Sequence, residues 1–363
     1  MAAILTRNAK RKGQQPDAAP PLPTDLAKLK LQVIHRKVEW GKARRSGESQ
    51  PAKAMALLQL FLARLTALRP VRVVQHYNLQ HGPLMSAGIG FNMFFSITGL
   101  LTTGFAVAGL VLSGQPLLVD SVIANVSASA PGLLKVDGGE GLVDPNDLLN
   151  PEGLGLTAII AAAVTVFTSL RWIDSVRAGL RGVVGLPPLK RNPVLLKLFD
   201  AGTLLLLGVA LVLSAGVSLV FGTAARWFID LLAVDPRVAD PFLWLMKTTV
   251  PLLLNWTTAV IMFRLAGGLE LRRQAFLEGT ILAGIGTTVL QIFSTELLAH
   301  AGRNPLLASF AVIIGLLIWF NLVSQVYLMS ASWAAIREGD RKSEGHPRKP
   351  TLGSRHQPPR QLS

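Results

Sequence analysis

The side chains of this chain that could carry chemistry are ionisable groups and amides set inside long apolar runs of sequence. An ionisable group at the depth of a bilayer costs free energy, so each one is a functional candidate by default. We predict a gating or other functional role for Asp200, Lys247 and Glu278. The structural alternative is that these side chains, and Glu296, reach lipid headgroups by snorkelling, because all lie within about two turns of the end of a run.

Five amide side chains mark what we expect to be the inward faces of these runs. They lie at helical spacing among Gly, Ala, Ser and Thr, which let membrane helices approach closely and hydrogen-bond across the contact. Close packing explains a stripe of small residues, whereas the amides exceed what packing needs and also suit a polar internal cavity. Both interpretations stay open at this point. The predicted substrate path consists of Asn92, Asn255, Gln291, Asn321 and Gln325.

No arrangement of residues in the sequence suits catalysis. The six histidines lie in terminal or connecting segments, without the His and Asp cluster of a hydrolytic metal site. Because the chain contains no cysteine, thiolate catalysis and cysteine metal sites are excluded. The nucleophile elbow, the P-loop and a strand-associated dinucleotide motif are absent as well. We therefore predict that the protein is not an enzyme and holds no cofactor or metal ion.

Six long apolar runs must position these side chains. A helix that crosses the hydrocarbon core of a bilayer needs about 20 apolar residues. Half of the 363 residues are hydrophobic and only 16% are charged, which is too apolar for an ordinary soluble domain. The predicted fold class is all-α: a polytopic membrane protein with a six-transmembrane helical bundle and an N-terminal amphipathic interfacial helix. The predicted spans are 87–113, 154–170, 198–222, 242–263, 275–299 and 306–333.

The basic residues alternate from one connection to the next. Fifteen Lys and Arg precede the first run, six lie between the second and third, three between the fourth and fifth, and seven follow the sixth. These make 31 of the 36 basic residues. Since basic residues near span ends stay on the cytoplasmic side, we predict a multi-pass protein of the inner or plasma membrane with both termini cytoplasmic.

The basic residues on that side could also gather anionic headgroups. Each Lys or Arg near an anionic membrane surface gains about 1 kcal/mol. The net charge of +15 could instead indicate nucleic acid, but the charges are spread over loops and tails rather than gathered in one soluble patch. We predict membrane lipids as partners and no nucleic acid. The predicted headgroup collar consists of Arg171, Arg177, Arg181, Arg272 and Arg273.

The segments outside the spans differ in composition. Residues 1–50 are basic and predicted to be a largely disordered cytoplasmic region, although 25–45 within them has the pattern of a surface helix. Residues 51–75 are apolar over too short a stretch for a span and are predicted to form the amphipathic interfacial helix. Residues 76–338 are the predicted six-span domain, and 339–363 are a predicted disordered cytoplasmic tail.

Three stretches between Val74 and Glu338 resemble the YihY/BrkB family of bacterial inner-membrane proteins, most closely its YhjD-like branch. They are HYNLQHGPLMSAGIGFNMFFSITGLL, RWIDSVRAGLRGVVGLPPLKRNPVLLKLFDAG and NPLLASFAVIIGLLIWFNLVSQVYLMSASWAAI. Trp319 fits the family's final span, whereas 330–333 replaces its glycine-rich acidic ending, so no role of that acid carries over. The resemblance implies an envelope protein, proposed in some branches to move lipids or lipid-linked precursors.

These observations predict a transporter or flippase for an amphipathic, anionic or lipid-linked substrate. The alternative is a non-transporting membrane scaffold that holds envelope partners through the basic N-terminal region and the acidic connection at 114–153. A membrane-bound nuclease ranks last, because the family's historical label of ribonuclease BN has no chemical support in this sequence. The sequence makes no prediction of the oligomeric state.

Overall fold

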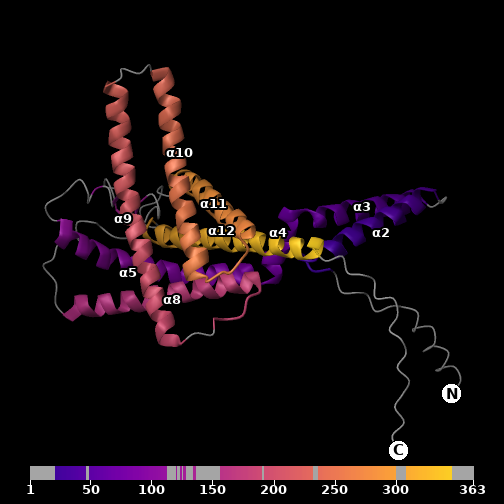
Figure 1. Cartoon of the computed structure of the whole chain (residues 1–363), viewed down its shortest axis with the longest axis horizontal. Helices are drawn as coiled ribbons and strands as arrows, with labels where there is room; N and C mark the ends of the chain where they lie inside the picture. Colours follow the sequence, from indigo (N-terminus) through magenta and orange to yellow (C-terminus); the bar gives the residue numbers. More distant parts are fainter. Residues whose placement is uncertain are drawn as a thin grey trace, which may run out of the picture. The chain divides into compact units, whose positions relative to one another are not determined.

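The structure is a computed structural model that describes residues 21–45, 49–112, 156–189, 192–231, 236–299 and 308–345, with isolated positions between 120 and 135. Every regular element in those six ranges is a helix (Figure 1). The prediction of an all-α fold is therefore confirmed. The chain forms two compact units, one of Val73–Glu338 and one that combines Met1–Arg72 with Gly339–Ser363.

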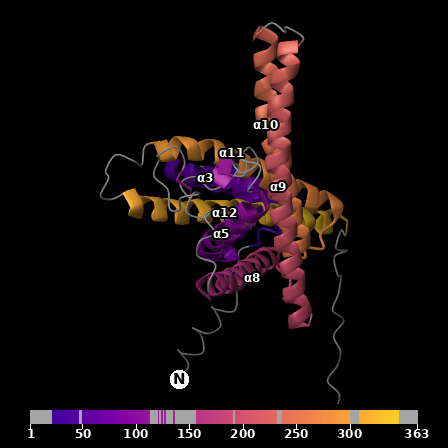
Figure 2. The ribbon, with the colours of Figure 1, turned by 90° about the vertical axis from the view of Figure 1, so that its left-hand side faces the viewer.

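The larger unit contains the long helices in which the predicted spans lie. Leucine, alanine and valine dominate them, and such residues favour helices once the backbone must satisfy its own hydrogen bonds. The helices α9 and α10 run side by side and cross α5 and α8 steeply (Figures 1 and 2). The elements are α5 (Gly82–Leu112), α8 (Leu156–Val184), α9 (Pro193–Leu231), α10 (Pro236–Ile261), the π-helix η2 (Met262–Ala266), α11 (Arg273–Ala299) and α12 (Ala308–Gly345).

Four of these helices are long and apolar enough to cross a membrane within the described residues. The qualifying stretches are Pro193–Ala210, Thr249–Ala266, Arg273–Ser294 and Ile313–Ser343. In α5 and α8 the predicted spans include many residues whose side chains the structure does not describe. Multiple apolar spans are thus confirmed, and the total of six stays a prediction.

Large apolar side chains cover much of the surface of these helices. Phe167 is 66% exposed, Leu205 71% and Phe293 61%, on α8, α9 and α11 respectively. Soluble monomers rarely expose contiguous apolar patches of this kind, whereas lipid tails cover them without cost. The exposed rows therefore indicate faces that contact the hydrocarbon core.

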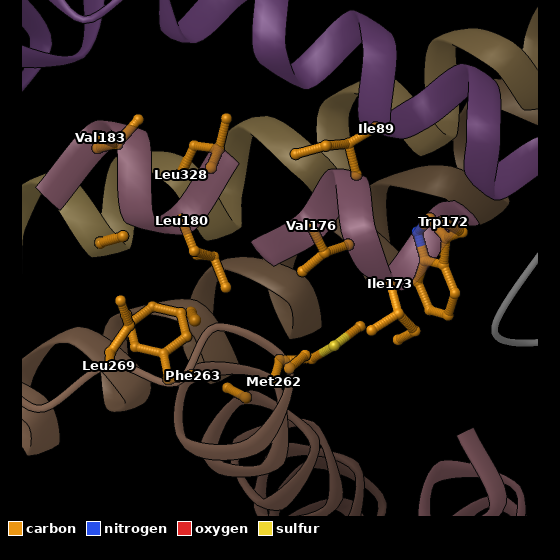
Figure 3. Close-up of a cluster of buried hydrophobic side chains, with 14 of the residues drawn as sticks. Ile89, Trp172, Ile173, Val176, Leu180, Val183, Met262, Phe263, Leu269 and Leu328 are labelled. Atoms are coloured by element: carbon orange, nitrogen blue, oxygen red, sulfur yellow. The ribbon is translucent and has the colours of Figure 1, made fainter. Parts of the chain in front are cut away.

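The interior of the larger unit is built around the second half of α8. Ile173, Leu180 and Val183 are fully buried on α8, and they pack with Phe263 of η2 and Leu269 of the loop after it (Figure 3). Ile173 and Leu180 are seven residues apart and Leu180 and Val183 three, which places them on one helix face. The apolar core thus fixes α8 against η2.

Glycines permit two close helix contacts. A Cβ on Gly90 of α5 would lie 2.8 Å from the backbone nitrogen of Asn321 on α12. A Cβ on Gly284 of α11 would lie 2.9 Å from the Cα of Trp256 on α10. Small residues at such points are what allow membrane helices to touch backbone to backbone.

The smaller unit begins with a helical hairpin. Helix α2 (Leu26–Arg45) lies within the region predicted to be largely disordered, where the sequence had indicated a surface helix, and it packs on α3 (Gln50–Ala67). Where the sequence predicts one interfacial helix over 51–75, the chain bends by 78° between α3 and α4 (Arg69–Leu79). Pro70 explains this break, because it has no N–H to continue the hydrogen-bond ladder of α3. The interfacial location itself stays a prediction.

A buried ion pair holds the smaller unit together. Arg72 is fully buried and donates to Asp340 at 2.6 Å and to the carbonyl of Pro23 at 2.6 Å. Arg69 adds a contact of 3.3 Å to the same carboxylate. Asp340 lies on α12, which continues to Gly345 through part of the predicted disordered tail. The rest of that tail lies outside the described residues.

Candidate functional site

A buried ion pair joins α8 to α9 close to the start of α9. The Arg177 guanidinium donates to both carboxylate oxygens of Asp200, with 3.3 Å between Nη1 and Oδ2. The Asp200 side chain is fully buried, and that of Arg177 is 8% exposed. A bidentate contact of this kind is strong and fixes the relative orientation of the two side chains. Pairing also offsets the cost of desolvating both charges. Asp200 is therefore a fixed partner of Arg177 in this structure.

Two arginines of α8 also bind the end of η2. Arg177 Nε donates to the carbonyl of Ala266 at 3.1 Å, and Arg181, one turn further on, donates to Gly268 at 2.9 Å. Arg181 also donates to the carbonyl of Pro187 at 2.6 Å. Carbonyls at a helix end lack intrahelical partners and carry partial negative charge, which a guanidinium offsets. These contacts hold the η2 end against α8.

Asp174 extends this cluster toward the surface. It accepts a hydrogen bond of 2.9 Å from Arg177 Nη1 and pairs with Lys197 of α9. Both side chains of this outer pair are roughly half exposed, Asp174 at 41% and Lys197 at 47%. Exposed pairs contribute little stability. We name Asp174, Arg177, Arg181, Lys197 and Asp200 the inner ionic junction.

A second polar cluster lies between α10 and α11. The Asn255 amide nitrogen donates to Thr288 Oγ1 and to Gln291 Oε1, both at 2.9 Å. One residue along α10, Trp256 Nε1 donates to Thr280 Oγ1 at 3.2 Å. Asn255 and Gln291 are only partly buried. We name Asn255, Thr288 and Gln291 the polar seam.

Helix α12 brings further amides to the level of this seam. Gly279 of α11 lies against Ala334, and Gly286 lies against Val326, so α11 and α12 run antiparallel in a defined register. Extending that register by five residues along α11 puts Gln291 level with Asn321. One turn on, Gln325 Nε2 donates to Asn321 Oδ1 at 3.3 Å. The amides of α10, α11 and α12 thus occupy one layer of the bundle.

Comparison with known proteins agrees with the resemblance seen in the sequence. The profile of the virulence factor BrkB family matches residues 73–352, which include both polar clusters. The chain belongs to this family. No solved structure is similar enough to this chain to count as a match.

Two curated proteins support this assignment to the BrkB family. The inner membrane protein YhjD of Escherichia coli (strain K12) is 25% identical over 281 residues, which are 74% of this chain and 80% of the relative. An uncharacterised protein of Dickeya dadantii (strain 3937) is 25% identical over 273 residues, 73% of this chain and 81% of its own. With the exposed apolar helices, this kinship makes the chain a membrane protein.

The predicted headgroup collar of this BrkB-family chain divides into two groups. Arg171, Arg272 and Arg273 are exposed. Arg177 and Arg181 are buried, and their donors bind the protein itself in the inner ionic junction. Headgroup binding by the exposed arginines stays a prediction. For the two buried ones, a headgroup would have to displace carbonyl and carboxylate partners.

The predicted gating residues are held in different ways. Asp200 is bound by Arg177, whereas Glu278 accepts from Trp333 Nε1 at 3.1 Å and from Arg337 Nε at 2.9 Å. The side chain of Lys247 lies outside the described residues, as does that of Glu296. Both described carboxylates are therefore charged partners of arginines.

The sequence singled out Asn255 and Gln291 of the polar seam, but not the pairing of Arg177. Asn255 and Gln291 are joined directly by a hydrogen bond, while Asn92 lies partly exposed on α5, two residues from the contact of Gly90 with Asn321. A signal for the pairing did exist, since a short connection brings the end of α8 back beside the start of α9. Within the described residues, no group of three His, Asp or Glu could hold a metal ion.

Proposed function

We propose that this BrkB-family protein moves an amphipathic anionic substrate, such as a lipid or a lipid-linked precursor, across the membrane. The observation that carries the proposal is the layer of amides at Asn255, Gln291 and Asn321 inside otherwise apolar helices. Amides offer donors and acceptors without fixed charge, so a headgroup could exchange its water for them and leave again. Close packing of helices through small residues does not by itself require amide side chains.

The cationic side of the protein supports the anionic nature of the substrate. Arg171 is exposed midway along α8, just after the second predicted span, and Arg272 and Arg273 are exposed at the start of α11. All three lie on the side predicted to be cytoplasmic. Cations at a membrane surface raise the local concentration of anionic headgroups. The exposed arginines would thus recruit substrate, while the inner ionic junction holds α8, α9 and η2 together.

The direct test is lipid movement in vesicles that contain the purified full-length protein. Fluorescent phosphatidylglycerol in the inner leaflet is protected from a membrane-impermeant quencher until it crosses the bilayer. We expect protein-containing vesicles to expose this lipid faster than empty vesicles, and faster than they expose a matched phosphatidylcholine probe. Equal rates in the two kinds of vesicle, for every amphiphile tried, would remove the proposal's main support.

The scaffold alternative is favoured by one specific observation in the smaller unit. Leu31, Ile34 and Val38 form an exposed apolar row on α2, each at least half exposed. A scaffold that holds envelope partners through this row should lose crosslinks when the three residues are changed to Glu. A transporter should keep its lipid-moving activity after the same changes.

A further inference from the structure

A groove runs along the first turns of α9, outside the two polar clusters. It has a volume of about 540 Å³ and is lined mainly by Leu195, Leu198, Phe199 and Leu265, with Gly202 among the lining residues. Leu195 is 61% exposed and Leu198 69%. The volume lies within the range of small-ligand sites, and the lining is apolar as such sites require.

Two faces of α9 are separated at this point. Leu195, Leu198, Phe199 and Gly202 follow the three, four and seven spacing of one helix face. Asp200 lies on another face, where Arg177 binds it. The inner ionic junction thus fixes the back of α9, and the apolar face is left uncovered by the described part of the chain.

Gly202 lines the groove without being needed for packing. A Cβ at Gly202 would meet no atom within 4 Å, so no neighbouring backbone requires glycine there. The ability of glycine to adopt a positive φ is not used here either, since Gly202 lies inside the regular helix α9. Among the described residues, nothing occupies the open space at Gly202, so a ligand can enter it.

The surrounding charge indicates the chemistry of the occupant. Arg264, the residue before the groove residue Leu265, is exposed. Asn192, which also lines the groove, caps α9 by accepting a hydrogen bond of 3.0 Å from the backbone nitrogen of Val194. The nearby carboxylates, Asp174 and Asp200, already have cationic partners. The charge left over near the groove is positive.

We propose that this groove holds one acyl chain of an anionic phospholipid and is the entry site of the transport route. The assignment rests on the proposed function, whose substrate class it names. An acyl chain that leaves the bilayer for an apolar groove exchanges one apolar environment for another. The acyl chain therefore adds shape complementarity and little hydrophobic free energy. The preference for one lipid comes from the headgroup, which the exposed Arg264 beside the groove attracts.

The test uses the full-length protein in vesicles of phosphatidylcholine and phosphatidylglycerol. The probe is phosphatidylglycerol with a photoreactive diazirine at the end of one acyl chain, and labelled peptides are identified by mass spectrometry. We expect labelling within 193–204, and a reduction of roughly fivefold or more in Gly202→Leu, which fills the groove. Gly208→Leu is the matched control, because Gly208 lies on the same helix and is equally open but does not line the groove.

Each outcome bears on the assignment. Undiminished labelling of Gly202→Leu overturns it, as does equal labelling by the matching phosphatidylcholine probe. Gly202→Ala, a smaller change, should give intermediate labelling, and thermal unfolding of all three variants verifies that they fold.

The proposed function fails separately from this assignment. If Gly202→Leu loses labelling but moves lipid at the wild-type rate, transport stands and the groove is not its entry site. If labelling follows the expectation while the wild-type protein moves no lipid, the groove binds lipid and the transport proposal is contradicted.

Discussion

Arg177 shows how a residue with the appearance of a surface cation can be structural. Its guanidinium contacts Asp174, Asp200 and the carbonyl of Ala266, and so connects α8, α9 and η2. The sequence assigns it to a headgroup collar because positive charge near a span end is usually exposed. Burial depends on which acceptors the fold brings near, and no local pattern encodes that.

Removing one partner of this pair should be costlier than removing both. Asp200→Leu leaves a buried guanidinium without its carboxylate, and we expect it to lower the free energy of unfolding by about 3–5 kcal/mol. Arg177→Met with Asp200→Leu should recover much of that loss. Denaturant unfolding in mild detergent measures both. If the double variant loses as much unfolding free energy, relative to wild type, as the two single variants lose together, the two side chains are not coupled.

His76 gives a prediction for pH. It lies on α4, outside the predicted spans, and its Nε2 donates to the carbonyl of Val183 at 2.9 Å. Burial lowers the pKa of His76 below its ordinary value, an effect that this hydrogen bond only partly opposes. At pH values near and below about 6.5, His76 therefore binds a proton more readily in the unfolded chain than in the folded protein.

Stability should fall as the pH drops through that range. We expect the free energy of unfolding to decrease between about pH 7.5 and 5.5, and His76→Gln, which keeps a side-chain donor, to show a smaller decrease. Thermal unfolding at several pH values measures the difference. An identical pH dependence in both proteins would exclude His76 as its source.

At the scale of elements, the sequence predicted where helices form better than where they contact one another. Apolar runs predicted the positions of α9, α11 and α12, because a helix is the structure that satisfies a backbone in lipid. The break at Pro70 also has a local cause, although the sequence was interpreted as one helix there. Contacts such as Gly90 against Asn321 depend on the relative placement of two helices distant in sequence, which no run of residues reveals.

Gly90 and Gly88 form a matched pair on α5. A Cβ at Gly90 would lie 2.8 Å from a backbone atom of α12, whereas a Cβ at Gly88 would meet nothing within 4 Å. We expect Gly90→Ala to lower the free energy of unfolding by about 1–3 kcal/mol through overpacking. Gly88→Ala should be neutral or slightly stabilising, since alanine favours a helix. Comparable losses in the two variants would contradict the close contact of α5 with α12.

At the scale of the whole molecule, composition and the pattern of apolar runs predicted a membrane protein, and three stretches of sequence predicted its family. The candidate functional site could be predicted only in part. The seam residues Asn255 and Gln291 stood out because amides are conspicuous in apolar runs. The groove along α9 did not, since Leu195, Leu198 and Gly202 are ordinary residues of a membrane helix and become a groove only beside Leu265.

The predicted orientation has a clean test because the chain contains no cysteine. A single cysteine introduced by Ser129→Cys, in the acidic connection, should react with an impermeant maleimide in intact cells. One introduced by Ser354→Cys, in the tail, should react only after permeabilisation, since the basic side stays cytoplasmic. The opposite labelling pattern would reverse the topology and move the exposed arginines to the outer face.

The central claim is that the polar seam carries a headgroup through the bundle. Its most direct measurement is the rate at which labelled phosphatidylglycerol crosses vesicles that contain Asn255→Leu with Gln291→Leu, compared with wild type and with Thr257→Val. Thr257 is the control because it is exposed on the same helix, and among the described residues its hydroxyl donates to the carbonyl of Leu253 at 2.9 Å, away from the seam. We predict a roughly tenfold slower rate in the seam variant, equivalent to about 1.4 kcal/mol of lost transition-state stabilisation, and a wild-type rate in the control. A folded seam variant that moves lipid as fast as wild type would contradict the account.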